Sequence, residues 1–105
     1  MTKLMIRQFG GSDIAKVSRD AAGQLQLDVL APELEVELQM LFTRLNVGPL
    51  ALRTGQRVKT PQGITHQTTV RQVFPGDPDF LRALSDALSR ERVAGRRVRG
   101  ILMEE

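Results

Sequence analysis

The stretch IAKVSRDAAGQLQLDVL, residues 14–30, has the pattern of a β-hairpin. Asp20 at the first turn position and Gly23 at the fourth predict a type I turn with a left-handed glycine, which leaves a three-residue loop. In that register Lys16 lies opposite Asp28 on one face. The other face is apolar and carries Ala15, Val17, Leu25, Leu27 and Val29. A strand pair with one apolar and one charged face is typical of a sheet that covers a core on one side.

The next stretch, APELEVELQMLFTRLNVGP, residues 31–49, fits two structures. A helix is favoured by Pro32 at a first helical position, by acidic residues in the first turn and by Gly48-Pro49 as a stop. Its apolar residues recur at helical spacing: Leu34, Leu38, Leu41, Phe42 and Leu45. The segment ELEVELQM also alternates as a strand would. We expect a helix, and a strand over residues 33–42 is the alternative, which would change the order of the sheet.

A second hairpin and helix repeat this layout. Residues 49–59 and 64–74 flank the turn Thr60-Pro61-Gln62-Gly63, for which we expect a three-residue loop. That register places Arg53 opposite Arg71. Its apolar face carries Leu50, Leu52, Val58, Ile64, His66, Val70 and Phe74, and its polar face carries Arg53, Arg57, Lys59, Thr65, Gln67, Thr69 and Arg71.

The helix expected after the second hairpin has a clear start. Asp77 is the expected N-cap and Pro78 the first helical residue. Gly95 is the expected C-cap. The apolar stripe of this helix comprises Phe80, Leu81, Leu84, Ala87 and Leu88.

These elements predict one α+β domain over residues 1–105 with a mostly antiparallel sheet. The sheet is built from two tandem β-hairpin-helix units, residues 14–46 and 47–91, with an N-terminal strand near residues 3–9 and a final strand over 96–103. We expect both helices on one face of the sheet. The other face is then either polar or covered by another subunit, and the final strand is a candidate dimer edge.

The composition and motifs exclude most catalytic chemistry. The chain has no cysteine and one histidine, so we expect no metal site and no cofactor. His66 is expected to be a half-buried structural residue, and capping explains Asp77 and Asp79. Gly10-Gly11 lacks the spacing of a phosphate-binding loop, and no nucleophile motif is present. We therefore expect a protein that is not an enzyme. No apolar run is long enough to span a bilayer and no secretory signal is seen, so we expect no membrane contact and a cytoplasmic location.

The charge pattern carries the functional hypothesis. The formal net charge is +3, and the excess of basic residues lies after residue 46. Two groups of cations stand out as candidate binding residues for nucleic acid or another anion: Arg53, Arg57, Lys59 and Arg71 on the second hairpin, and Arg96, Arg97 and Arg99 near the C-terminus. The four phenylalanines, Phe9, Phe42, Phe74 and Phe80, are all expected in the core, which leaves no stacking platform.

Two functions remain open. In the first, a small noncatalytic basic domain contacts the backbone of RNA or DNA. In the second, the chain is an assembly subunit, with a homodimer expected, whose arginines meet an acidic protein partner or Glu33, Glu35 and Glu37 of a second copy.

Overall fold

The computed structural model describes residues 2–104 as a mixed α+β chain with antiparallel strands and two helices, as the sequence predicts. In chain order the elements are β1 (Thr2–Gln8), β2 (Asp13–Arg19), β3 (Leu25–Val29), the 3-10 turn η1 (Pro32–Leu34), α1 (Glu35–Asn46), β4 (Leu50–Thr60), β5 (Gly63–Val73), α2 (Phe80–Leu88), β6 (Arg92–Val93) and β7 (Arg96–Glu104).

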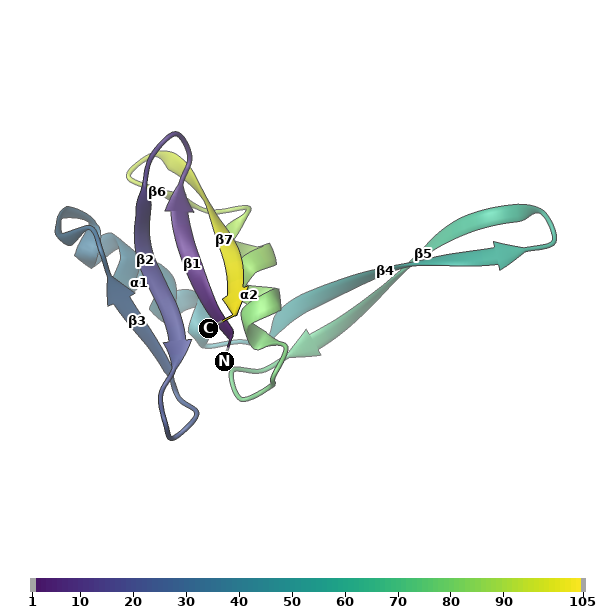
Figure 1. Ribbon diagram of the computed structural model, residues 1–105, viewed down its shortest axis with the longest axis horizontal. Coiled ribbons are helices and arrows are strands. Elements are labelled where there is room, and N and C mark those ends of the chain that lie inside the picture. Colours follow the sequence, from purple (N-terminus) through teal and green to yellow (C-terminus); the bar gives the residue numbers. More distant parts are fainter. Residues whose placement is uncertain (1, 105) are drawn as a thin grey trace.

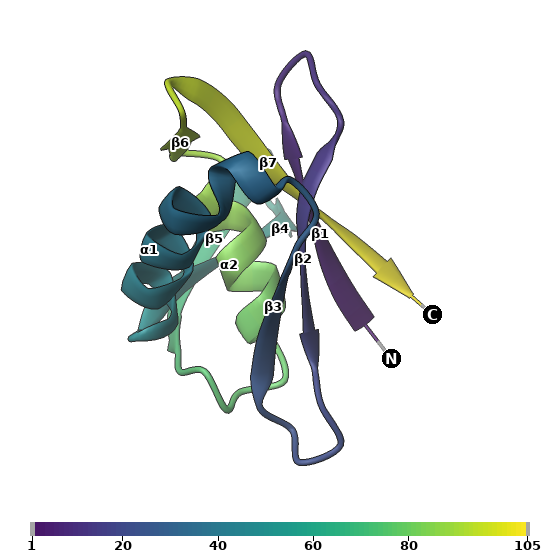
Figure 2. The ribbon, with the colours of Figure 1, turned by 90° about the vertical axis from the view of Figure 1, so that its left-hand side faces the viewer.

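The strands form two separate sheets. Five of them make an antiparallel sheet in the order β3-β2-β1-β7-β6, so the two terminal strands β1 and β7 lie next to each other near its centre. Both helices lie on the same side of this sheet (Figure 2). Strand alternation directs Leu4, Ile6 and Val98 toward the helices, where each is at most 3% exposed. The opposite face of the sheet has no helix over it, and we call it the open face.

The first hairpin has the predicted register. Val17 pairs with Leu27, and Lys16 pairs with Asp28, with 3.7 Å between the ammonium and carboxylate groups. Gly23 has a φ of +81°, which a residue with a side chain rarely adopts. The turn geometry and the burial of one face both select this register, because the helices cover one face of β2 and β3.

Residues 35–46 are helical, so the helical interpretation of this ambiguous segment is confirmed. Leu38, Leu41 and Leu45 are buried on one side of α1. Val36 and Met40 lie on the other side and are 71% and 69% exposed. The alternation of ELEVELQM is therefore incidental, since burial follows the helical period instead.

The second hairpin, β4 and β5, leaves the body of the molecule as a long two-stranded arm, residues 50–73 (Figure 1). Only Leu52 and Val73, near its base, are buried, and they belong to the same core as α2. The arm raises the radius of gyration to 15.6 Å, against about 13 Å for a compact chain of this length.

The three-residue loop that we predicted for the arm is wrong. Thr60 pairs with Gly63, which leaves the two-residue loop Pro61-Gln62 and moves every cross-strand pair by one position. Arg53 consequently lies opposite Val70 and not opposite Arg71. The prediction assumed that one face of the hairpin is buried, whereas most of the arm is covered on neither face, so burial does not select the register there.

Exposure of the arm also overturns the expectation for its single histidine. His66 is exposed and pairs with Arg57, instead of being half-buried. Ile64 and Val70, which we expected on a covered face, are 58% and 60% exposed.

Two of the phenylalanines expected in the core are also exposed. Phe9 lies in the turn after β1 and is 65% exposed, and Phe74 lies in the loop after β5 and is 60% exposed. Both follow the end of a strand, beyond the area that the helices cover. Phe80, in contrast, is completely buried at the start of α2.

The second helix is shorter than the sequence suggested. It begins at Phe80, with Asp79 at the N-cap position, while the Asp77 side chain accepts the backbone N–H of Asp79 at 2.9 Å in the preceding turn. It ends at Leu88, so Gly95 is not its C-cap. Ala94 and Gly95, with φ of 53° and 77°, form instead the tight turn between β6 and β7.

Candidate nucleic-acid interface

Three of the candidate cations share one face of the arm. Arg53, Arg57 and Lys59 alternate along β4, and the residues opposite them on β5 are Val70, His66 and Ile64. All six side chains are exposed. We call this surface the basic face of the arm.

No acidic residue balances the basic face locally. Residues 50–73 contain no aspartate or glutamate. Within the part of the chain that the structure describes, none of the three cations forms an ion pair. From Arg53 to Lys59 the strand rises by about 20 Å, which equals about six phosphate steps along one strand of a nucleic-acid duplex. The arm therefore presents an extended row of cations to solvent.

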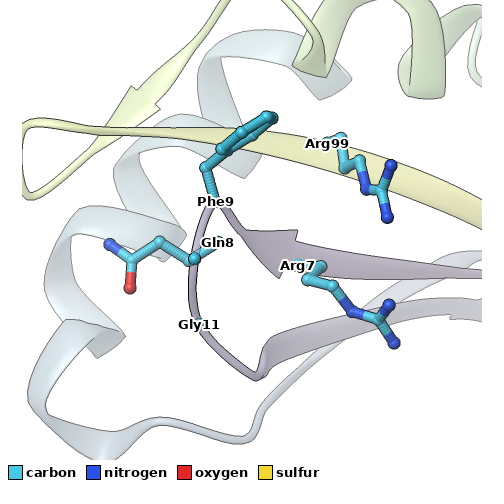
Figure 3. A pocket seen from close by; sticks show the side chains of 6 residues that line it. Arg7, Gln8, Phe9, Gly11 and Arg99 are labelled. Carbon is cyan, nitrogen blue, oxygen red and sulfur yellow. The ribbon is translucent and has the colours of Figure 1, made fainter.

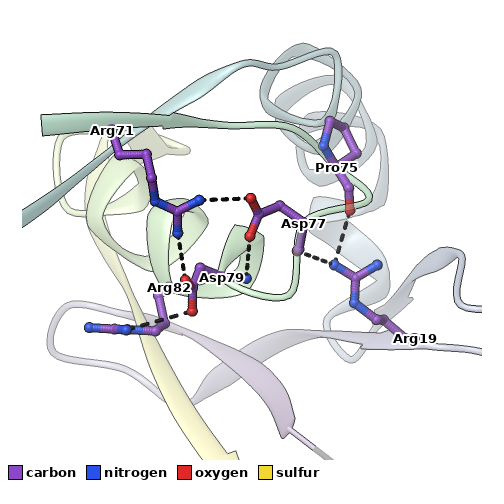
Figure 4. Close-up of polar contacts among 6 residues, drawn as sticks. All are labelled: Arg19, Arg71, Pro75, Asp77, Asp79 and Arg82. Atoms are coloured by element: carbon purple, nitrogen blue, oxygen red, sulfur yellow. Dashed lines mark hydrogen bonds and ion pairs between the residues drawn. The ribbon is translucent and has the colours of Figure 1, made fainter.

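The fourth arm cation has a different environment. Arg71 pairs with Leu52 and so lies on the opposite face. Its guanidinium donates to Asp77 at 2.8 Å and to Asp79 at 2.5 Å (Figure 4). These two ion pairs join the base of the arm to the turn before α2 and offset the charge of Arg71.

A second arginine holds the same turn from the other side. The guanidinium of Arg19, on β2, donates to the backbone carbonyls of Pro75 and Asp77 at 3.0 and 2.9 Å (Figure 4). The pKa of Asp77 is lowered, chiefly because its carboxylate accepts the Asp79 N–H and further because Arg71 donates to it and both arginines are nearby. The contacts of Arg19, Arg71, Asp77 and Asp79 therefore connect the arm to the sheet and to the start of α2.

Strand alternation divides the C-terminal candidates between two faces. Arg97 and Arg99 lie on the open face, since Val98 between them points to the helices and is 2% exposed. Arg96 pairs with Val93 and projects from the other side of β7. All three are exposed, and none is in an ion pair within residues 2–104.

The structure brings two further residues to the C-terminal group. Arg7 on β1 pairs directly with Arg99 on β7, and Phe9 follows two residues later (Figure 3). Together with Gln8, Gly10 and Gly11 they line a hollow of about 150 Å³. No local pattern in the sequence specifies that the N-terminal strand pairs with the C-terminal strand, so this group could not be predicted from the sequence.

The described residues offer neither a metal site nor a membrane-spanning helix. Among residues 2–104 no group of three or more histidine or acidic side chains is placed to hold a metal ion. No helix in the same range is long and apolar enough to cross a membrane.

Comparison with known proteins adds no assignment: no protein-family model matches the chain, and neither a curated protein nor a solved structure is significantly similar to it.

Proposed function

We propose that this chain is a noncatalytic, cytoplasmic protein that binds the phosphate backbone of nucleic acid through the basic face of its arm. The observation that carries the proposal is a projecting hairpin with Arg53, Arg57 and Lys59 in a row and no aspartate or glutamate within residues 50–73 to neutralise them. A polymer with one phosphate at every step matches such a row, and the release of its counterions supplies the binding free energy.

The shape of the arm supports the same ligand. A two-stranded ribbon fits the major groove of a duplex, where it reaches phosphates on both sides. An isolated two-stranded hairpin is also only marginally stable in water, so an extended partner along both strands stabilises it. Arg71 is left out of the proposed contact because two carboxylates already hold its guanidinium.

The test is binding of a labelled 20-base-pair DNA duplex as salt is varied. The variant Arg53→Gln/Arg57→Gln/Lys59→Gln should bind more weakly, and its plot of log affinity against log salt should be less steep by about 2.7, since three phosphate contacts are lost.

The matched control is Arg44→Gln/Arg82→Gln/Arg90→Gln. It removes the same charge from arginines that are paired with Glu91, Asp79 and Asp86. We expect a salt slope close to that of the wild type. Equal losses in both variants would show that net charge, and not the arm, determines binding, and the proposal would then be wrong.

A second candidate function is supported by the outer side of α1. Val36 and Met40 are exposed there next to the acidic residues of η1 and the first turn of α1, which are Glu33, Glu35 and Glu37. Glu37 is already engaged, because its carboxylate accepts the backbone N–H of Ala94 at 2.7 Å. An arm from a second copy would bring apolar and basic side chains to this surface. The molar mass in solution distinguishes this assembly function from the first.

A further inference from the structure

The hollow at the end of β1 combines charge with an exposed aromatic ring. Arg7 and Arg99 form a cross-strand pair on the open face, and the ring of Phe9 lies at the end of the same strand as Arg7 (Figure 3). Phe9 follows in the turn directly after β1 and lines the same hollow as Arg7 and Arg99, so the ring and the guanidinium groups are within the reach of one small ligand.

The cations of this hollow lack sufficient counter-charge. Like charges directly opposite each other destabilise a strand pair. Arg7 is partly neutralised by Asp13, whose carboxylate lies 2.8 Å from its Nε. Arg99 has no carboxylate partner within the described residues, and the neighbouring pair Arg92 and Arg97 is again two arginines. This end of the open face therefore carries net positive charge that a bound anion would relieve.

The aromatic ring beside these arginines is accessible. Phe9 is 65% exposed, although a phenylalanine normally gains free energy by burial. The two residues that follow are glycines, and a side chain at Gly10 would meet nothing within 4 Å. The ring is the one aromatic group among the residues that line the hollow, which are otherwise Gln8, Gly10, Gly11 and the two arginines.

We infer that this hollow, lined by Arg7, Phe9 and Arg99, binds a nucleotide unit. The base stacks on Phe9, and the phosphate accepts hydrogen bonds from Arg99 and Arg7. Arginine suits this role because its planar donors match phosphate oxygens. Every base has a flat face, so stacking on one phenylalanine selects an unpaired base without selecting its identity.

Two ligands contain this chemistry: a free mononucleotide and a single strand of DNA or RNA. In the interior of a duplex the faces of the bases are covered by their neighbours, and we therefore expect an intact duplex to bind poorly at Phe9. The inference does not depend on the arm, because it concerns different residues on a different sheet.

The experiment measures affinity for a labelled 15-base thymidine strand, with dTMP and inorganic phosphate as competitors. Phe9→Leu should weaken binding of the strand by about tenfold, the effect of losing one stacked base. The matched control is Phe74→Leu, which changes the other largely exposed phenylalanine outside this hollow, and it should bind as the wild type does. Competition by dTMP would identify a free nucleotide as sufficient, and competition only by a second strand would identify the polymer.

A second variant tests the proposed phosphate contact separately from base stacking. Arg99→Gln should weaken binding of the strand at low salt while its melting temperature equals or exceeds that of the wild type, because it removes a like-charge pair. Equal affinity of Phe9→Leu and the wild type for the strand would overturn the inference. So would displacement of the strand by inorganic phosphate as effectively as by dTMP. The variant Arg53→Gln/Arg57→Gln/Lys59→Gln retains Arg7, Phe9 and Arg99. Its affinity for the thymidine strand therefore tests the hollow separately from the arm.

Discussion

At the scale of single residues, exposure decides the role of each candidate more than residue type does. Arg53 and Arg71 belong to the same hairpin, yet Arg53 faces solvent with no acidic partner among residues 2–104, while two aspartates hold Arg71. Phe80 is a core residue and Phe9 is a surface residue. The sequence identifies the cations and aromatic residues. Whether each one is exposed, paired or buried depends on the strand register and on how far the helices cover the sheet.

The network around Asp77 leads to a prediction for stability against pH. Its pKa is lowered in the folded chain, so its carboxylate stabilises the fold at neutral pH, and this contribution is lost as pH falls below about 4. In Asp77→Asn the side-chain oxygen can still accept the Asp79 N–H, but the charge is absent. We expect the difference in unfolding free energy between wild type and variant to shrink from pH 7 to pH 3.

Urea unfolding followed by circular dichroism at several pH values measures this difference. Arg71→Gln removes one cause of the lowered pKa and should give a pH dependence between those of the wild type and Asp77→Asn. Parallel pH profiles for the wild type and Asp77→Asn would show that the network does not stabilise the folded chain.

At the scale of elements, the contact between α2 and β7 depends on one glycine. The Ser85 hydroxyl donates to the carbonyl of Gly100 at 3.0 Å. A methyl group at Gly100 would lie 2.7 Å from a methyl group of Leu4 and 3.1 Å from the Cα of Ser85. Helix and strand can therefore approach this closely only because position 100 has no side chain.

Gly100→Ala should lower the free energy of unfolding by about 1–3 kcal/mol, the usual cost of overpacking a core. Gly55→Ala is the matched control, because a side chain there meets nothing within 4 Å and should leave stability unchanged or slightly higher. Thermal and urea unfolding of both variants check this expectation. If Gly100→Ala were as stable as the wild type, the close contact of α2 with β7 would be incorrect.

At the scale of the whole molecule, the arm determines the elongated shape of the protein. The longest dimension is 55 Å, and the arm extends along it away from the five-stranded sheet (Figure 1). The hollow at Phe9 lies on that sheet. A ligand bound at both places would therefore have to be a polymer, which is consistent with a nucleic acid and not with a small anion.

Light scattering during size-exclusion chromatography tests the two proposed functions together. The chain has no tryptophan or tyrosine, so protein contributes little absorbance at 280 nm and bound nucleic acid is evident at 260 nm. We expect a complex that absorbs at 260 nm at low salt and dissociates at high salt into particles with the mass of one chain. A dimer without absorbance at 260 nm would contradict the first function and support assembly through α1.

The sequence by itself determined the α+β class, the register of the first hairpin and the excess of arginine after residue 46, and it favoured a helix over a strand within residues 31–49. Each depends on local periodicity, turn chemistry or composition, which act over a few residues. The tertiary structure alone decided which strands meet and which surfaces remain uncovered. It paired β1 with β7, left the second hairpin outside the main sheet and placed Phe9 beside Arg7 and Arg99. Those outcomes follow from contacts between residues far apart in the chain, so no local pattern contains them.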